Sequence, residues 1–221
     1  MGETVKLTAD DGHSFDAYVA RPAEQPKAGV VVVQEIFGVN KHVRGVADGF
    51  AKDGYLAVAP AMFDRVTPRI ELGYDKDDVA QGREIRSKIT WDAALADVAA
   101  ALGFVAGAGK AAVVGYCWGG SVAWLAACRH NLAAAVCYYG GNIHECRNET
   151  PSCPVMFHFG EEDASIPMEQ VKEIGAAHPK QELFTYPAGH GFNCEMRGSY
   201  HADSAAVARE RTLAFLARTI G

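Results

Sequence analysis

Apolar residues along this chain gather in short continuous runs, separated by longer segments in which they recur every three or four positions. A short run that is apolar throughout is typical of a strand covered on both faces of a sheet. The longer spacing is typical of a helix with one buried face. The runs predict strands over Gly29–Gln34, Tyr55–Ala59, Ala111–Val114, Leu132–Tyr138, Val155–Phe159 and Glu182–Tyr186, and the spacing predicts helices over His42–Asp53, Asp75–Lys88, Trp91–Val105, Gly119–Cys128, Met168–Ala177 and Ser204–Thr219.

The amino-terminal segment differs, because polar and apolar residues alternate in Thr4–Thr8 and Ser14–Ala20. These runs flank the turn sequence Asp10-Asp11-Gly12 and predict an antiparallel β-hairpin. Beyond it, strands and helices alternate, which predicts an α/β fold with a mainly parallel twisted sheet and helices on both faces. Because no repeat, low-complexity segment or long linker divides the chain, residues 1–221 are expected to form one domain.

The composition narrows the classes of partner and location. The 221 residues carry a formal net charge of −6 and no cluster of basic residues, so nucleic acid is not an expected partner. The polar start MGETVKLTADDG has no signal-peptide layout, and no apolar run approaches the roughly 18 residues of a membrane span. These features predict a cytoplasmic protein without membrane contact, and they leave its oligomeric state open, a monomer included.

The six cysteines include no Cys-x-x-Cys pair, and the chain is too long to be read as a disulfide-stapled miniprotein. Cys128 and Cys137 lie in apolar runs and are expected in the core. His144-x-Cys146 with Cys153 does not match the ligand spacing of a zinc site. The sequence therefore predicts neither a metal nor another cofactor.

Cys117 stands alone in a tight turn between a predicted strand and a predicted helix. Gly115-Tyr116-Cys117-Trp118-Gly119 has the pattern Gly-x-nucleophile-x-Gly, in which the glycines let the strand and the helix approach closely. The helix start offers free N–H groups and a positive dipole end, which favour a thiolate and a developing oxyanion. A buried structural cysteine at an ordinary strand–helix turn is the alternative.

A thiol nucleophile needs a base, and the base needs an acid that orients it. Asp163 follows one predicted strand in FGEEDASIP, and His190 follows another in YPAGHGF. In a parallel sheet both residues would reach the same carboxyl edge as Cys117, and the order nucleophile, acid, base is that of α/β-hydrolases. Alternatively, Asp163 is a solvated turn acid with Glu161 and Glu162 as rivals for the role, and His190 is an ordinary loop histidine.

The stretch QEIFG directly follows the strand GVVVVQ, at the loop that supplies one oxyanion N–H in α/β-hydrolases. The backbone N–H groups of Ile36 and Trp118 are the predicted oxyanion pair. Glu35 is unexpected beside them, because a carboxylate repels developing negative charge. An exposed loop glutamate is the simpler interpretation of Glu35.

With these four stretches, QEIFGVN, VGYCWGG, FGEEDASIP and YPAGHGF, the chain resembles the dienelactone hydrolase (carboxymethylenebutenolidase) family. The resemblance implies an α/β-hydrolase fold and a triad of Cys117, His190 and Asp163 that opens a lactone through an acyl-enzyme. It also implies that Glu35 pairs with the resting Cys117 until the carboxylate of the substrate displaces it.

The family also holds the substrate carboxylate with arginines, which suit planar bidentate contacts. One family arginine follows the catalytic histidine by four residues, but this chain has Cys194 there, in HGFNC. Arg197 lies three residues further on, and Arg83 or Arg86 of a predicted helix would supply the second contact. Because of this departure, the substrate is predicted only as a small ester or lactone, dienelactone-like and bearing a carboxylate.

Four aromatic residues, Phe37, Trp118, Tyr139 and Phe192, are predicted to line the substrate pocket, although each fits the core equally well. Cys194 is either a bystander or a resolving thiol for an oxidised Cys117. A general carboxylesterase or thioesterase is the nearest alternative function. A redox or ligand-binding module using Cys117 is a non-hydrolytic alternative.

Overall fold

The apolar runs form the centre of one eight-stranded sheet in a computed structural model that describes residues 2–221. The strands are β1 (Glu3–Thr8), β2 (Ser14–Ala20), β3 (Gly29–Val33), β4 (Leu56–Pro60), β5 (Ala111–Tyr116), β6 (Ala134–Tyr138), β7 (Val155–Gly160) and β8 (Glu182–Tyr186). The helices are α1 (Lys41–Lys52), α2 (Lys76–Ser87), α3 (Trp91–Val105), α4 (Trp118–Arg129), α5 (Met168–Ala177) and α6 (Ala202–Thr219), with short 3₁₀ helices η1 (Met62–Arg65) and η2 (Ala106–Ala108).

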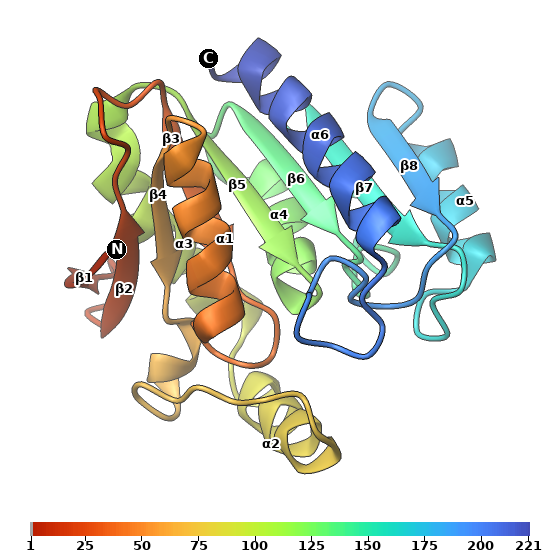
Figure 1. The fold of residues 1–221 in the computed structure, drawn as a ribbon, viewed down its shortest axis with the longest axis horizontal. Coiled ribbons are helices and arrows are strands. Elements are labelled where there is room, and N and C mark those ends of the chain that lie inside the picture. The colour runs from red at the N-terminus through yellow and green to blue at the C-terminus, as the bar shows by residue number, and fades with distance from the viewer. Residues whose placement is uncertain (1) are drawn as a thin grey trace.

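The strand order is β1-β2-β4-β3-β5-β6-β7-β8 (Figure 1). Strands β3 to β8 run parallel, whereas β1 pairs with β2, and β2 with β4, in antiparallel fashion. The predicted α/β-hydrolase-like sheet with an amino-terminal hairpin is therefore confirmed. The chain moves outward from β3 to β4 and then returns to β5, so the order reverses between β3 and β5. The carboxyl ends of strands at such a switch point border a crevice in which ligands bind.

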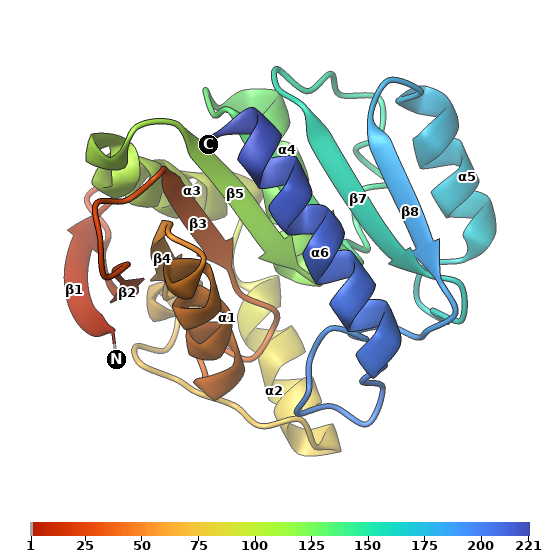
Figure 2. The same ribbon diagram turned by 45° about the horizontal axis from the view of Figure 1, so that its top comes forward.

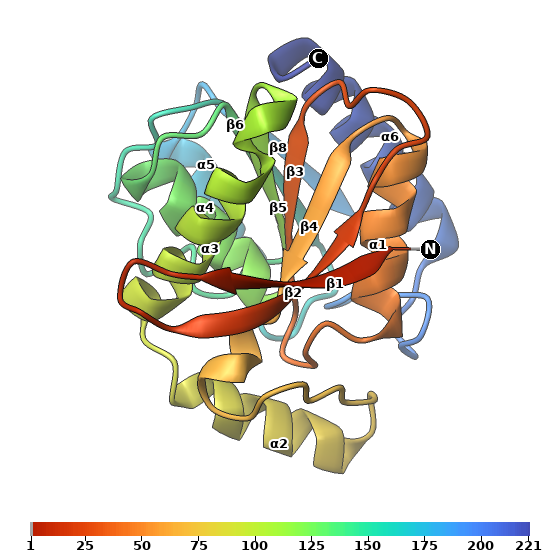
Figure 3. The same cartoon turned by 90° about the vertical axis from the view of Figure 1, so that its left-hand side faces the viewer.

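Helices cover both faces of the sheet. Helices α1 and α6 lie on one face, and α3, α4 and α5 lie on the other (Figures 1 and 3). All residues of β3, β4 and β6 are buried between these layers, which explains why their sequences are apolar throughout. Helix α2 lies apart, beyond the carboxyl ends of the parallel strands (Figure 2). Its placement makes α2 a cover over that edge.

Element boundaries differ from the predicted ones where local hydrogen bonds decide them. Strand β5 continues to Tyr116, and α4 begins at Trp118, which leaves Cys117 alone at the junction. Asp75 accepts hydrogen bonds from two backbone N–H groups and caps α2, so this residue precedes the helix. The segment between β4 and α2 contains the short helix η1.

One segment modifies the expectation about membranes. Trp91–Ala108 has a mean hydropathy of 1.4 over 18 residues and is long and apolar enough to cross a membrane by length and composition. In the fold, α3 packs on strands β3 and β4 of the sheet. Its apolar side is thus the buried side of a core helix.

Candidate active site

Cys117 has a backbone conformation that few non-glycine residues adopt, with φ 54° and ψ −118°. A Cβ on Gly115 would lie 1.8 Å from the carbonyl oxygen of Gly119, and a Cβ on Gly119 would lie 2.3 Å from that of Val33. Only glycine fits at these two positions, because strand β5, helix α4 and strand β3 meet there. The turn therefore holds Cys117 in a strained position at the end of β5.

His190 and Asp163 align with this cysteine. His190 Nε2 lies 3.1 Å from Cys117 Sγ, and His190 Nδ1 lies 2.7 Å from Asp163 Oδ2. The Asp163 side chain is fully buried, and its other oxygen accepts a hydrogen bond of 2.8 Å from the Ser165 N–H. Ser199 Oγ donates a 2.7 Å hydrogen bond to the His190 carbonyl and holds the loop that carries the imidazole. The three groups have the geometry of a nucleophile, a base and an orienting acid.

The groups on either side of His190 favour its protonated, charged form. Burial by itself lowers the pKa of His190, but a thiolate at Cys117 and the Asp163 carboxylate outweigh it and raise that pKa to about 10. The acceptor groups on both sides of the ring thus favour its protonated form.

Two backbone N–H groups flank the thiol without donating a hydrogen bond within residues 2–221: those of Ile36, after β3, and of Trp118, the first residue of α4. The first N–H groups of a helix have no intrahelical acceptor. Gly82 of α2 packs directly against the Ile36 peptide, because a Cβ at this position would lie 2.0 Å from the Ile36 carbonyl oxygen. The arrangement can stabilise an oxyanion between the two donors.

A cavity of about 230 Å³ opens over the thiol. Its lining includes eight residues that the sequence singled out: Cys117, His190, Ile36, Trp118, Phe37, Arg83, Arg86 and Arg197. The Arg86 guanidinium lies 4.7 Å from the centre of the Trp91 ring, and it has no salt bridge among the described residues. Burial lowers the pKa of Arg86, which still leaves the group charged at neutral pH. Cationic groups thus face the nucleophile from helix α2.

Arg197 reaches the cavity from the loop after His190. Its guanidinium passes over Gly191, where a Cβ would lie 2.3 Å from Nη1 and where φ is +77°. Arg197 Nη1 donates a 3.0 Å hydrogen bond to Glu35 Oε1. The loop geometry therefore lets an arginine seven residues after the histidine reach the pocket.

Glu35 is buried, with an exposed fraction of 1%, so it is not an exposed loop residue. The expected pairing of Glu35 with the resting Cys117 is not present: Glu35 pairs with Arg197, and Cys117 Sγ contacts His190. The guanidinium is the better partner, because a buried carboxylate needs a full opposite charge nearby. The Cys117 thiol therefore contacts the His190 imidazole instead of Glu35.

Tyr139, Phe192 and Cys194 do not line this cavity and have exposed fractions of 0%. The Tyr139 ring lies 5.2 Å from the His190 ring and 5.3 Å from that of Phe192. Tyr139 therefore packs against the imidazole and Phe192 packs against Tyr139, and the expectation that the two residues line the pocket is wrong. Apolar character alone cannot distinguish a pocket wall from the layer behind it.

Four residues in the cavity wall were not singled out by the sequence: Val79, Gly141, Asn142 and Ser165. Ser165 follows Asp163 by two residues, the spacing of an Asx turn, and that spacing was a usable signal. Gly141 and Asn142 come from the loop after β6, where no sequence pattern distinguishes them.

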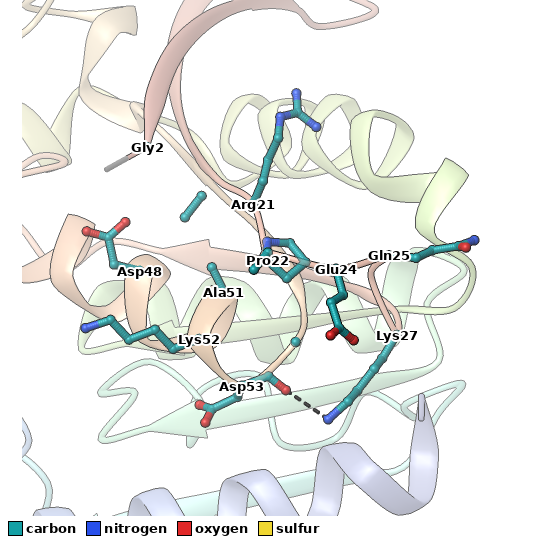
Figure 4. Close-up of a pocket in the computed structure, with 13 residues that line it drawn as sticks. Gly2, Arg21, Pro22, Glu24, Gln25, Lys27, Asp48, Ala51, Lys52 and Asp53 are labelled. Atoms are coloured by element: carbon teal, nitrogen blue, oxygen red, sulfur yellow. Dashed lines mark hydrogen bonds between the residues drawn. The ribbon is translucent and has the colours of Figure 1, made fainter.

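A larger hollow, of about 950 Å³, lies at the opposite edge of the sheet, between the loop before β3 and the end of α1. Its side chains include Arg21, Lys52 and Lys27, whose Nζ donates a 3.0 Å hydrogen bond to the Asp53 carbonyl (Figure 4). It contains none of the predicted site residues. The convergence of the thiol, imidazole and carboxylate, rather than size, makes the smaller cavity the candidate site.

Comparisons with known proteins agree with this geometry. The model of the dienelactone hydrolase family matches residues 15–220. Carboxymethylenebutenolidases of Pseudomonas putida and Pseudomonas knackmussii are each 33% identical over 228 residues, which cover 98% of this chain and 97% of theirs.

Solved structures show the same architecture. A Klebsiella pneumoniae protein provisionally named a dienelactone hydrolase has a TM-score of 0.88 and 32% identity, over 99% of this chain and 98% of its own. An esterase of Pyrococcus furiosus has a TM-score of 0.74 over 100% of this chain and 92% of its own, and its 16% identity extends the likeness to the fold alone.

Proposed function

The chain belongs to the dienelactone hydrolase family and is a hydrolase of small esters or lactones, and we propose that it acts on carboxylate-bearing substrates through Cys117. One observation carries this proposal. The thiol at the strained strand–helix turn, the imidazole of His190 and the carboxylate of Asp163 form a continuous line of contacts of 3.1 and 2.7 Å. That line ends in a cavity whose other wall carries arginines.

The reaction begins with attack of the Cys117 thiolate on the carbonyl carbon of the ester. A C–S bond forms, and the carbonyl oxygen becomes an oxyanion between the Ile36 and Trp118 N–H groups. The C–O bond of the ester then breaks. The His190 imidazolium donates its Nε2 proton to the leaving alkoxide or enolate, which in a lactone stays attached to the acyl-enzyme.

Deacylation uses the imidazole that the first step leaves neutral. His190 Nε2 takes a proton from a water molecule, and the resulting hydroxide attacks the thioester carbon. The C–S bond breaks, and the thiolate and imidazolium are restored. Asp163 holds the imidazole in the tautomer that presents Nε2 to the reacting atoms throughout.

The arginines that line the cavity are evidence for a substrate that carries a carboxylate. Arg83 and Arg86 face the cavity one helical turn apart on α2, and Arg197 faces it from the loop after His190. Arg86 forms no salt bridge among the described residues, and Glu145 acts on it only at longer range, so a substrate carboxylate can contact it without displacing a paired one. A neutral ester would make no such contact.

The test is steady-state hydrolysis of a dienelactone and of p-nitrophenyl acetate by the wild type and by Cys117→Ala. Cys128 does not line the cavity, so Cys128→Ala serves as the control variant. We expect Cys117→Ala to lose about 10³-fold or more of kcat on both substrates, and Cys128→Ala to retain it. Mass spectrometry of the quenched reaction should find the acyl group on the Cys117 peptide. Full esterase activity in Cys117→Ala would remove the nucleophile from the proposal.

The carboxylate is tested with Arg86→Met, which keeps an unbranched aliphatic stem and removes the guanidinium. We expect kcat/KM for the dienelactone to fall about 10- to 100-fold, the range of a charge-assisted hydrogen bond, and that for p-nitrophenyl acetate to change little. Equal losses on both substrates would instead favour a general carboxylesterase or thioesterase. A cytoplasmic location belongs to the same proposal, because six free cysteines suit a reducing compartment.

A further inference from the structure

A cluster of side chains that could bind a metal includes Glu35, the residue before Ile36. It lies outside the contacts among Cys117, His190 and Asp163. One potential ligand atom each of Glu35, His42 and Cys194 lies within 4.8 Å of the others, and all three residues are buried. We propose that these residues form a site for a single Zn²⁺ ion. The proposal does not depend on the esterase reaction, because neither Cys117 nor His190 belongs to the cluster.

Two of the three residues have buried polar atoms without a partner. Glu35 Oε2 and His42 Nε2 make no hydrogen bond within residues 2–221, and the exposed fractions of these residues are 1% and 2%. A buried polar atom without a partner is unfavourable, and one ligand shared by Glu35 Oε2 and His42 Nε2 would relieve both. A cation held by both atoms and the thiolate of Cys194 would satisfy them at once.

Each ligand is oriented by a neighbouring group, as in known metal sites. His42 Nδ1 lies 2.7 Å from Glu195 Oε2, which fixes the tautomer that leaves the lone pair of Nε2 free. Glu35 Oε1 accepts the hydrogen bond of Arg197, so Oε2 is the oxygen left for a metal. The Tyr74 hydroxyl lies beside Cys194 and can donate to its thiolate. Such partners hold ligands in place before an ion arrives.

The mixture of nitrogen, sulfur and oxygen ligands favours zinc over the alkaline-earth ions, which prefer oxygen alone. Two anionic ligands, Glu35 and the Cys194 thiolate, would balance the charge of the ion. Binding releases one proton, that of the Cys194 thiol. Three protein ligands leave a fourth tetrahedral position for water.

A second cavity approaches the cluster at His42. It has a volume of about 240 Å³ and is lined by His42, Asn193, Glu195, Tyr116 and Arg209, among others. The Glu195 side chain is 57% exposed and contacts His42 at 2.7 Å. An ion entering here would approach the cluster past His42, outside the catalytic cavity.

The experiment titrates the chelator-treated protein with Co²⁺, the spectroscopic substitute for zinc, and then displaces it with Zn²⁺. We expect one Co²⁺ per chain, with a thiolate-to-cobalt charge-transfer band. The band should disappear in Cys194→Ser, and affinity should fall by about 100-fold or more in His42→Gln, beyond the range of outer-shell changes. Glu195→Gln, which removes only the orienting carboxylate, should weaken binding about 10- to 100-fold.

The catalytic pair is the rival site, because Cys117 and His190 can also bind a soft ion. Cys117→Ala should keep the charge-transfer band, and Cys128→Ser serves as the thiol control. Loss of the band in Cys117→Ala, or its persistence in Cys194→Ser, would assign the ion elsewhere and overturn the proposal. Absence of stoichiometric binding to the wild type would do so as well.

A second measurement keeps the test independent of how well the variants fold. Zn²⁺ that binds only the folded protein raises the melting temperature. We expect this rise in the wild type and in Cys117→Ala, and none in Cys194→Ser relative to its own metal-free melting temperature. An equal rise in Cys194→Ser would contradict the proposed ligand set.

Discussion

His190 determines the pH range over which the proposed reaction can run. Its pKa of about 10 is raised above the ordinary value near 6.5 by its thiolate and carboxylate neighbours, against the effect of burial. The imidazolium that protonates the leaving group therefore persists until the pH rises through about 10. We expect kcat/KM for an alkyl ester, whose alkoxide leaving group needs that proton, to show its alkaline decline there.

The variant Asp163→Asn tests the cause of this shift. It removes one of the two anions that raise the pKa of His190, so the alkaline decline should move to lower pH, and kcat should fall as the imidazole loses its orientation. Circular dichroism at each pH excludes unfolding as the reason for lost rate. If the decline occurs at the same pH in both proteins, Asp163 does not act on His190.

Glu35 offers a second test at the residue scale. Because Glu35 pairs with Arg197 at 3.0 Å and Cys117 with His190 at 3.1 Å, replacing the carboxylate should not release the thiol. We expect Glu35→Gln to change the rate of iodoacetamide labelling of Cys117 only slightly. A large increase would show that the glutamate restrains the resting thiol, as the family resemblance implies.

At the scale of elements, helix α2 packs through Gly82 against the loop that carries Ile36 and so sets the position of this loop. A Cβ at Gly82 would lie 2.0 Å from the Ile36 carbonyl oxygen, so Gly82→Ala must displace the loop or the helix. We expect kcat to fall by up to about 10²–10³-fold, the usual cost of losing one oxyanion donor. Stability should fall by about 1–3 kcal/mol, as overpacking typically costs.

Gly103→Ala is the matched control for this substitution. Gly103 also lies within a helix, α3, but a Cβ there would meet nothing within 4 Å. We expect unchanged kcat and a gain of about 0.5–1 kcal/mol in the free energy of unfolding, because alanine is the better helix former. Urea unfolding and initial rates of both variants give the comparison. An unchanged kcat in Gly82→Ala would mean that helix α2 does not position the loop that carries Ile36.

The elements that the sequence predicts well are those whose burial is periodic. β3 and α3 follow from their apolar pattern, since each is buried in a layered fold. Arg197 could not be placed in this way. It lies in the irregular loop between β8 and α6, where its reach depends on the positive φ of Gly191 and on a buried partner 162 residues away. No periodic pattern encodes such a contact.

The Glu35, His42 and Cys194 cluster illustrates the same limit. Its members come from the loop after β3, the first turn of α1 and the loop before α6, and only the sheet topology brings them together. Metal motifs recognised from sequence rely on close spacing of at least two ligands. Here the thiol is separated from the other two residues by most of the chain.

At the scale of the whole molecule, one buried histidine links stability to pH. Burial lowers the pKa of His158 to about 3, and its ring nitrogens contact Tyr186 and Thr212 at 2.8 and 3.1 Å. The unfolded chain binds a proton at this histidine below about pH 6.5, while the folded chain does not until about pH 3. The stability contributed by neutral His158 is therefore complete above about 6.5 and is lost as the pH falls through that window.

Urea unfolding at several pH values, with His158→Gln as the comparison, measures this effect. The free energy of unfolding of the wild type should fall by up to about 1.4 kcal/mol more per pH unit than that of the variant in the window below about pH 6.5. The variant is expected to be less stable at neutral pH, so the slopes rather than the absolute values are compared. Equal slopes would mean that the ring is protonated in the fold.

Helix α2 stands beyond the sheet with only Gly82 and Ile85 buried among its twelve residues. A segment with so little buried surface opens at a small fraction of the free energy of global unfolding. Arg83 and Arg86 on this helix line the cavity together with Arg197 of the loop after His190, so an anionic product would draw the helix and the loop together. The residence time of that product, rather than bond breaking, would then limit turnover at low ionic strength, and added salt would shorten it.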